Sequence, residues 1–147
     1  MADYVAADTT AFSSLTKVSG DSRAYQQILG ERRLAVSFQT PPELRGTKFG
    51  PPRQKRIDEL LAATLVLPHA ESTDVWYARV AERRNELRKL QQPGAGANEA
   101  DIWIISSALE HRLPFMSHDI HQVCLGRAMG LPVLTNLDGL RDDNPQL

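Results

Sequence analysis

The sequence has only one cysteine, Cys124, in 147 residues. A single thiol cannot form an internal disulfide, which excludes a disulfide-stapled scaffold and favours a reducing compartment. No apolar run approaches the roughly 20 residues that span a bilayer. The first residues also lack the charged and apolar regions of a secretory signal. We therefore expect a cytoplasmic protein with no membrane partner.

An excess of charge of either sign is also missing. With 17 Lys and Arg against 18 Asp and Glu, the formal net charge is −1. This balance argues against a general polyanion binder, although basic residues cluster at 44–56 and 83–90 and could form a local basic face. The chain is long enough for one packed core, and it contains no repeat or linker. We expect a single domain over residues 1–147.

Strand-like and helix-like patterns alternate along the chain. Short apolar segments predict strands at 4–7, 34–38, 64–68, 113–117 and 131–135, and helical patterns follow at 22–33, 53–63, 74–90, 99–111 and 119–129. Such alternation is typical of parallel strands joined by right-handed helical crossovers. The expected fold is α/β, a three-layer sandwich in which helices flank a central parallel sheet.

Several helix starts have recognisable capping residues. Thr40 followed by Glu43 matches a capping box, with Thr40 as the N-cap of the helix that begins with two prolines. Ser72 or Thr73 is the expected cap of the long helix, and Asn98 is the expected cap of the apolar helix that follows.

Four acidic residues lie at corresponding places in this pattern. Asp8 follows the first strand, Glu43 follows the second, Asp101 lies in the first turn of the apolar helix, and Asp119 follows the fourth strand. Each one alone is explained as a cap or as a partner of a helix dipole. Ligands, however, bind at the carboxyl ends of parallel strands, where these acids would gather. Two carboxylates about 5 Å apart repel by roughly 3 kcal/mol, so a group of four favours a hard cation, Mg²⁺ or Mn²⁺.

Two other chemistries are weighed against this one. His118, His121 and Cys124 are spaced by three residues and suggest zinc, but the usual four-ligand spacing is missing. Asp8 with its threonines faintly resembles the start of an aspartate-nucleophile phosphotransferase. That class needs a lysine late in the fold, and no lysine follows Lys89.

The order and context of the acids resemble a known family. The segments "YVAADTTAFSSL", "LAVSFQTPPELRG", "NEADIWIISSAL" and "LPFMSHD" together resemble the PIN domain, specifically the VapC-type ribonuclease toxins of toxin–antitoxin modules. The resemblance runs from Tyr4 to about Thr135. It implies a PIN-like parallel α/β fold, acids gathered around Mg²⁺ or Mn²⁺, and RNA cut by metal-activated water.

The resemblance also has departures. Thr10 stands where such proteins usually carry Asn or Ser, and "IISSAL" stands where two alanines are common. The segment "IHQV" replaces an aromatic residue that commonly follows the last acid. These changes bear on substrate preference more than on the fold.

Carried over by position, the resemblance assigns roles to the acids. Asp8 and Asp101 are expected to bind the metal directly, Asp119 directly or through water, and Glu43 as a ligand or as the residue that orients the attacking water. Thr10 and Ser117 are expected donors to these carboxylates, with helix or turn capping as the alternative. Candidate RNA contacts are the basic residues Arg45, Lys48, Arg53, Lys55 and Arg56, although a solvated helix face also explains most of them.

The expected partners follow from the same resemblance. They are an RNA substrate, a cognate antitoxin and a second copy of the chain in a homodimer. Trp76 and Tyr77, with the segment around Phe12 and Leu15, offer large apolar groups for an interface. A PIN-like RNA-processing nuclease outside a toxin–antitoxin pair, or a non-catalytic RNA-binding or protein-binding scaffold, remains as an alternative.

Overall fold

The computed structural model describes residues 3–18 and 20–137 and is built around a five-stranded parallel sheet. Its strands, which all pair in parallel, are β1 (Tyr4–Ala7), β2 (Arg33–Ser37), β3 (Leu65–Leu67), β4 (Phe115–Met116) and β5 (Val133–Leu134). Their spatial order is β3-β2-β1-β4-β5. The predicted strand positions and the parallel sheet are confirmed, with the last three strands shorter than expected.

Seven helices connect and cover the strands within the described residues. They are α1 (Thr9–Ser14), α2 (Gly20–Leu29), α3 (Thr40–Arg45), α4 (Pro51–Ala62), α5 (Glu71–Lys89), α6 (Glu99–Glu110) and α7 (Ile120–Ala128). None of these helices is both long and apolar enough to cross a membrane.

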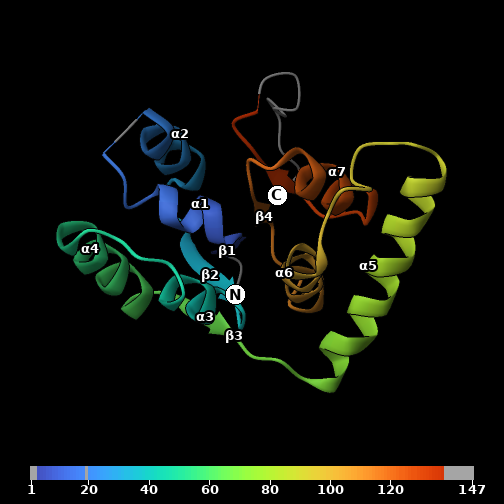
Figure 1. The fold of residues 1–147 in the computed structure, drawn as a ribbon, viewed down its shortest axis with the longest axis horizontal. Coiled ribbons are helices and arrows are strands. Elements are labelled where there is room, and N and C mark those ends of the chain that lie inside the picture. The colour runs from blue at the N-terminus through green and yellow to red at the C-terminus, as the bar shows by residue number, and fades with distance from the viewer. Residues whose placement is uncertain (1–2, 19, 138–147) are drawn as a thin grey trace.

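The helices form a layer on each face of the sheet (Figure 1). Because successive strand residues point to opposite faces, Val5 and Ala7 pack with Phe12, Tyr25 and the helices α1 to α4. Ala6 between them packs instead with the cluster formed by α5, α6 and α7. The three-layer α/β sandwich predicted from the sequence is therefore confirmed.

The strand order creates a switch point beside β1. The chain proceeds outward from β1 to β2 and β3, and then crosses to the other side of β1 to form β4 and β5. Ligands of open parallel sheets bind where connections leave in opposite directions, outside the carboxyl ends of the strands. Here that place lies between the ends of β1 and β4, where the amide of Asp8 donates to the carbonyl of Met116 at 3.2 Å.

Two of the predicted helix caps are wrong. The N-cap of α3 is Gln39, and Thr40 is the first helical residue, so the expected capping box with Glu43 does not form. Thr40 is buried instead, with its hydroxyl 3.2 Å from that of Thr9. A cap one residue earlier leaves the Thr40 side chain available to join α3 to α1.

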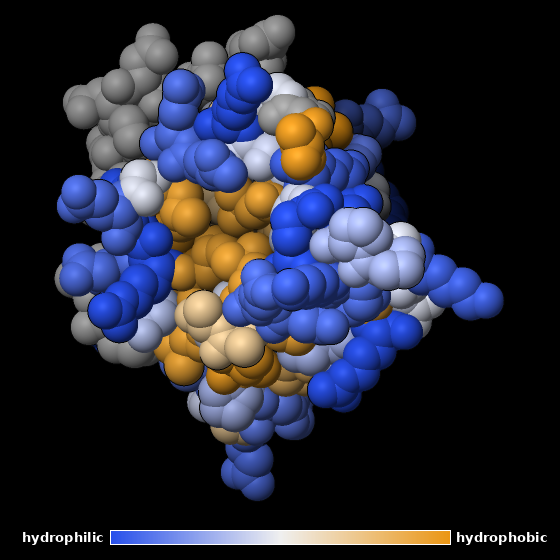
Figure 2. All heavy atoms as spheres, turned by 90° about the vertical axis from the view of Figure 1, so that its left-hand side faces the viewer, coloured by the Kyte–Doolittle hydropathy of each residue, from blue (hydrophilic) through white to orange (hydrophobic). Residues whose placement is uncertain are grey.

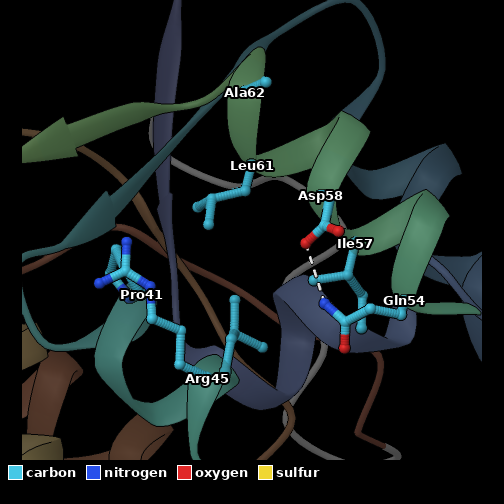
Figure 3. Close-up of a pocket in the computed structure, with 8 residues that line it drawn as sticks. Pro41, Arg45, Gln54, Ile57, Asp58, Leu61 and Ala62 are labelled. Carbon is cyan, nitrogen blue, oxygen red and sulfur yellow. Dashed lines mark hydrogen bonds between the residues drawn. The ribbon is translucent and has the colours of Figure 1, made fainter.

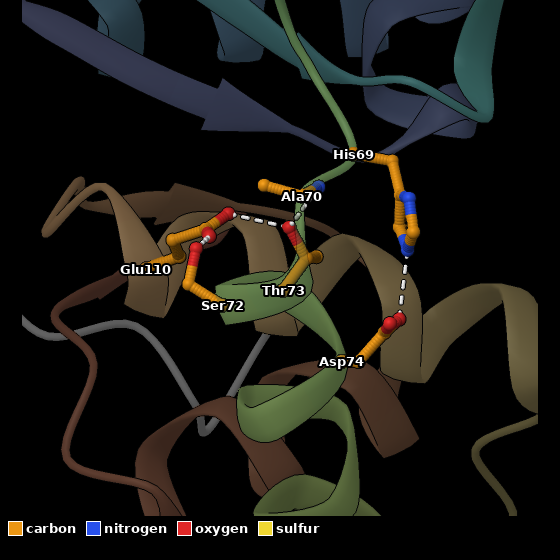
Figure 4. Close-up of polar contacts among 6 residues, drawn as sticks. All are labelled: His69, Ala70, Ser72, Thr73, Asp74 and Glu110. Carbon is orange, nitrogen blue, oxygen red and sulfur yellow. Dashed lines mark hydrogen bonds and ion pairs between the residues drawn. The ribbon is translucent and has the colours of Figure 1, made fainter.

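The long helix α5 also begins earlier than predicted, with Ala70 as its N-cap rather than Ser72 or Thr73. Figure 4 shows how this end is held. The Thr73 hydroxyl accepts from the Ala70 amide at 2.9 Å and donates to Glu110 of α6 at 2.7 Å. Ser72 also donates to Glu110, and His69 pairs with Asp74. The two contacts with Glu110 fix α5 against α6, whose first turn carries Asp101.

An apolar hollow opens on the outer side of the α3 and α4 pair. Figure 2 shows apolar side chains gathered in a depression bordered by hydrophilic ones on this side of the molecule. A cavity of about 310 Å³ between the two helices is lined by Pro41, Leu44, Arg45, Gln54, Ile57, Asp58, Leu61 and Ala62 (Figure 3).

Candidate functional site

Asp8 is held at the end of β1 by both of its carboxylate oxygens. It is the N-cap of α1, where Oδ1 accepts from the amide of Ala11 at 2.6 Å. The other oxygen, Oδ2, accepts from the hydroxyl of Ser117 at 3.1 Å. The side chain is only 1% exposed, and this burial raises the pKa of Asp8 to about 7. The two hydrogen bonds lower the pKa, while the charges of Asp101 and Asp119 raise it.

The two carboxylate oxygens of Asp101 also have different partners, one in the backbone and one in a side chain. Asn98 is the N-cap of α6, as predicted, and it accepts from the Asp101 amide at 2.9 Å. In return, Asp101 Oδ2 accepts from the Asn98 amide at 2.9 Å. The other oxygen, Oδ1, accepts from the Nε2 amide of Gln122 at 2.6 Å. Burial raises the pKa of Asp101 above its ordinary value, and Asp119 adds to the rise.

Asp119 caps the third helix that starts at this edge. As the N-cap of α7, its Oδ1 accepts from the amides of His121 at 2.9 Å and Gln122 at 3.1 Å. Its own amide donates to Ser117 Oγ at 3.1 Å. Ser117 therefore donates to the carboxylate of Asp8, the contact that the sequence predicted, whereas toward Asp119 it accepts the backbone amide, which is the turn-capping alternative.

The capping and ligand explanations of these acids are compatible. In each of the three residues, one oxygen accepts a backbone amide at a helix start. In Asp8 and Asp101, the second oxygen accepts a side-chain donor, Ser117 or Gln122. The helix start therefore orients each carboxylate through one oxygen only. The second oxygen can exchange its side-chain donor for another group.

Glu43 reaches the site from α3, although its side chain is exposed. Partial desolvation of its carboxyl group raises the pKa of Glu43, a hydrogen bond with Thr9 lowers it, and the charge of Asp101 raises it. The threonine that contacts an acid of the site is therefore Thr9, which contacts Glu43. Thr10, the threonine predicted from the sequence, is exposed.

Gln122 is a site residue that sequence reasoning missed. Its side chain is 6% exposed, and its carbonyl oxygen accepts from Ser117 Oγ at 3.0 Å while its amide donates to Asp101. Gln122 therefore links Asp101 directly, and Asp8 through Ser117. The sequence did contain a signal for Gln122, because a single polar amide lies three residues after Asp119 among apolar residues. The comparison with the PIN domain had noted only that an aromatic residue is absent from this segment.

The donor set fits a hard cation in its chemistry. All four acids supply carboxylate oxygens, the ligands that Mg²⁺ and Mn²⁺ prefer. Asp101 lies close enough to raise the pKa of both Asp8 and Glu43, and the charge of Asp119 raises the pKa of Asp101. As the side chains stand, however, no three His, Cys, Asp or Glu residues among 3–18 and 20–137 are arranged to hold a metal ion. The Gln122 amide lies among the acids.

The candidate RNA contacts divide into two groups. Arg53 donates to Thr16 Oγ1 at 3.3 Å and to the Ser13 carbonyl at 3.2 Å, and Arg56 donates to the Thr16 carbonyl at 2.8 Å. These arginines fasten α4 to the end of α1, which is a structural role. The side chains of Arg45, Lys48 and Lys55 are exposed, and Lys55 lies 4.0 Å from Glu59.

The residues of the zinc alternative are used differently. His121 Nδ1 accepts from the amides of Gly94 and Gly96, each at 3.2 Å. The imidazole thereby holds the loop before α6 against the start of α7. Cys124 is partly exposed on α7. Nδ1 of His121 is therefore occupied by hydrogen bonds that hold this loop.

The proposed interface around Phe12 is not supported by the structure. Phe12 is completely buried among Val5, Tyr25 and the other residues of the core beneath α1 and α2. Tyr77 packs against Trp103 of α6, with ring centroids 4.1 Å apart. The Phe12 part of the expected surface is therefore wrong, because a large apolar group near the chain start was needed for the core.

The chain is similar in fold to several solved structures. No protein-family model and no curated protein matches the chain. Among solved structures, a chain of VapBC-1 from nontypeable Haemophilus influenzae is similar, with 24% identity, a TM-score of 0.63, and coverage of 90% of this chain and 97% of the other.

Two further structures agree. A chain of FitAcB from Neisseria gonorrhoeae has 17% identity, a TM-score of 0.67, and coverage of 88% of this chain and 96% of the other. A chain of VapBC-5 from Mycobacterium tuberculosis, described as a member of the VapBC family of toxin-antitoxin systems, has 21% identity and a TM-score of 0.58, with coverage of 90% and 97%. The chain therefore has the PIN-like fold that it shares with chains of VapBC and FitAcB structures.

Proposed function

We propose that this protein is a metal-dependent endoribonuclease that uses Mg²⁺ or Mn²⁺. The observation that carries the proposal is the position of Asp101, whose charge interacts with Asp8, Glu43 and Asp119 at the switch point of the sheet. Four acids gathered at one edge are costly unless a cation compensates for their charge. Burial is the main cause of the raised pKa values of Asp8, Glu43 and Asp101, and the charges of the neighbouring acids add to the rise.

The residues would divide the chemistry as follows. A bound divalent cation would polarise the scissile phosphate and lower the pKa of the attacking water. Asp8 and Asp101 would hold the cation with the oxygens that face away from their helix starts, and Asp119 would hold it directly or through water. Glu43, the exposed acid, would orient the attacking water. Ser117 would donate to Asp8 and keep its carboxylate in place.

The basic residues would bind the substrate backbone. Arg45, Lys48 and Lys55 have exposed side chains on α3, on α4 and in the segment between them. Phosphate contacts by such residues supply most of the affinity for RNA without reading its sequence. Arg53 and Arg56 would act indirectly, by fixing α4 to α1.

We also propose that the protein is the toxin of a toxin–antitoxin pair and forms a homodimer in the cytoplasm. The support for the antitoxin is the fold shared with chains of VapBC and FitAcB structures, one of which is described as belonging to a family of toxin-antitoxin systems. The apolar hollow between α3 and α4 is a surface that a protein partner would cover.

A cleavage assay tests this proposal. We expect the purified protein to cut a structured RNA with Mg²⁺ or Mn²⁺ and to lose this activity in EDTA. Asp101→Asn should reduce cleavage by at least about 100-fold, because it removes one metal-binding charge while the amide still accepts from Asn98. Asp58→Asn, at an exposed acid of α4, is the matched control and should remain active.

The same assay examines the partner. If a small reading frame next to the gene encodes the antitoxin, adding its product should stop cleavage by the wild-type protein. Cleavage that persists in EDTA, or that is unchanged in Asp101→Asn, would refute the metal mechanism. RNA binding without cleavage under all metal conditions would instead support the non-catalytic scaffold.

A further inference from the structure

The side chain of Gln122 occupies the space between the acids. It reaches from the first turn of α7, and it is almost completely buried. Its amide nitrogen lies 2.6 Å from Asp101 Oδ1, and its carbonyl oxygen lies 3.0 Å from Ser117 Oγ. The same hydroxyl lies 3.1 Å from Asp8 Oδ2. One amide therefore engages Asp101 directly and Asp8 through Ser117.

The two oxygens of each acid differ in how readily they can change partner. Asp8 Oδ1 and Asp101 Oδ2 accept backbone amides at the starts of α1 and α6, so releasing them would disturb those helix ends. Asp8 Oδ2 and Asp101 Oδ1 accept from side chains, which can rotate away. A cation that binds both acids would therefore use Asp101 Oδ1 after Gln122 has left, and Asp8 Oδ2, which has a second lone pair while Ser117 donates to it.

Ser117 couples the two contacts. A hydroxyl has one hydrogen, so it donates to either Asp8 Oδ2 or the Gln122 carbonyl at any moment. While Gln122 is in place, the two acceptors compete for that hydrogen. When Gln122 leaves, the hydrogen is committed to Asp8. Departure of the amide thus frees an oxygen of Asp101 and strengthens the orientation of Asp8 in a single rearrangement.

We propose that Gln122 closes the acid site in the metal-free protein, and that its amide must leave Asp101 before a divalent cation binds. The amide hydrogens supply partial positive charge to Asp101, the place that a cation would take. This inference rests on the proposed function because it concerns the same metal site. Gln122 is a positioning residue here, since it acts through Asp101 and Ser117.

Manganese binding measured by calorimetry tests the inference without using RNA. Gln122→Met keeps the length of the side chain but removes both hydrogen bonds. A hydrogen bond to a charged group that need no longer be broken should make Mn²⁺ binding roughly tenfold tighter. Gln54→Met is the matched control, because it removes another amide-to-carboxylate bond, from Gln54 Nε2 to Asp58 at 2.9 Å, outside the acid site. Its Mn²⁺ affinity should equal that of the wild type.

Gln122→Asn provides a second variant in case methionine disturbs the buried position. It keeps the amide but shortens the side chain by one methylene, so it cannot span both partners, and it should also bind Mn²⁺ more tightly. Weaker or unchanged binding in the folded Gln122 variants would overturn the inference and leave the nuclease proposal standing. If neither the wild type nor any variant binds Mn²⁺, both proposals fail.

Discussion

The buried carboxyl of Asp8 makes the metal-free protein sensitive to pH. Its folded pKa of about 7 lies above the ordinary value of 3.8, so the folded state retains a proton that the unfolded chain releases. This contribution to stability is complete below about pH 4 and is lost as the pH rises toward 7. We expect the free energy of unfolding in EDTA to fall over this range.

Asp8→Asn tests the source of that pH dependence. The asparagine cannot ionise, and its oxygen can still cap α1. Its free energy of unfolding should therefore depend less on pH between 4 and 7, and it should exceed that of the wild type at pH 8. Urea denaturation at several pH values in EDTA measures both. Equal slopes in the two proteins would show that Asp8 is not the group responsible.

Single residues of the site were predictable to different degrees. The places of Asp8 and Asp119 at helix starts were predictable because each follows a short apolar strand, and that of Asp101 because Asn98 marks a helix start three residues earlier. Their role as metal ligands stays a prediction. Gln122 was missed because its role depends on β4 and α6 coming together, which local sequence does not encode. Thr9 and Thr10 are equivalent in the sequence, and only the exact start of α1 decides which one contacts Glu43.

Among the connecting elements, the loop between α5 and α6 depends on Gly94. This glycine has a φ of +107°, and a Cβ there would lie 2.8 Å from Leu87 Cδ1 and 3.2 Å from the Leu125 amide nitrogen. Gly94→Ala should therefore lower the free energy of unfolding by about 2 to 4 kcal/mol, through backbone strain and overpacking. It should also loosen the contact of the loop with His121, next to Asp119.

Gly20→Ala is the control for this substitution. Nothing lies within 4 Å of a Cβ at Gly20, which begins α2, so alanine should be neutral or stabilising by up to about 1 kcal/mol. Chemical denaturation of both variants gives the comparison. An equally mild effect at both glycines would mean that the loop adapts and does not depend on its tight packing.

The positions of the elements followed from hydrophobic pattern, but their boundaries did not. The five strands lie where short apolar segments predicted them. The start of α3 was misplaced because Thr40, Pro41 and Glu43 match a capping box locally, whereas burial of Thr40 against Thr9 decides its position in the fold. The start of α5 was misplaced for a similar reason, since Thr73 is buried and contacts Glu110.

For the whole molecule, alternation of strands and helices predicts a parallel sheet but leaves the strand order open. The observed order puts β4 beside β1 and brings segments over 100 residues apart into one site, as in the contact between Asp8 and Ser117. The resemblance to the PIN domain supplied that grouping before the structure did. Asp8 and Asp119 are the N-caps of α1 and α7, and Asp101 completes the capping box of α6. That the same three acids also hold a metal ion at a shared site stays a prediction.

The most direct test of this double role is the stabilisation of the protein by metal. The melting temperature of the wild type should rise in excess Mn²⁺ relative to EDTA, because the cation binds the folded state. Asp8→Asn should melt higher than the wild type in EDTA near neutral pH, yet gain much less from Mn²⁺, while the control Asp58→Asn should gain as much as the wild type. If Asp8→Asn instead melts lower by the same amount with and without Mn²⁺, Asp8 is only a helix cap, and the account of a metal-binding acid site is contradicted.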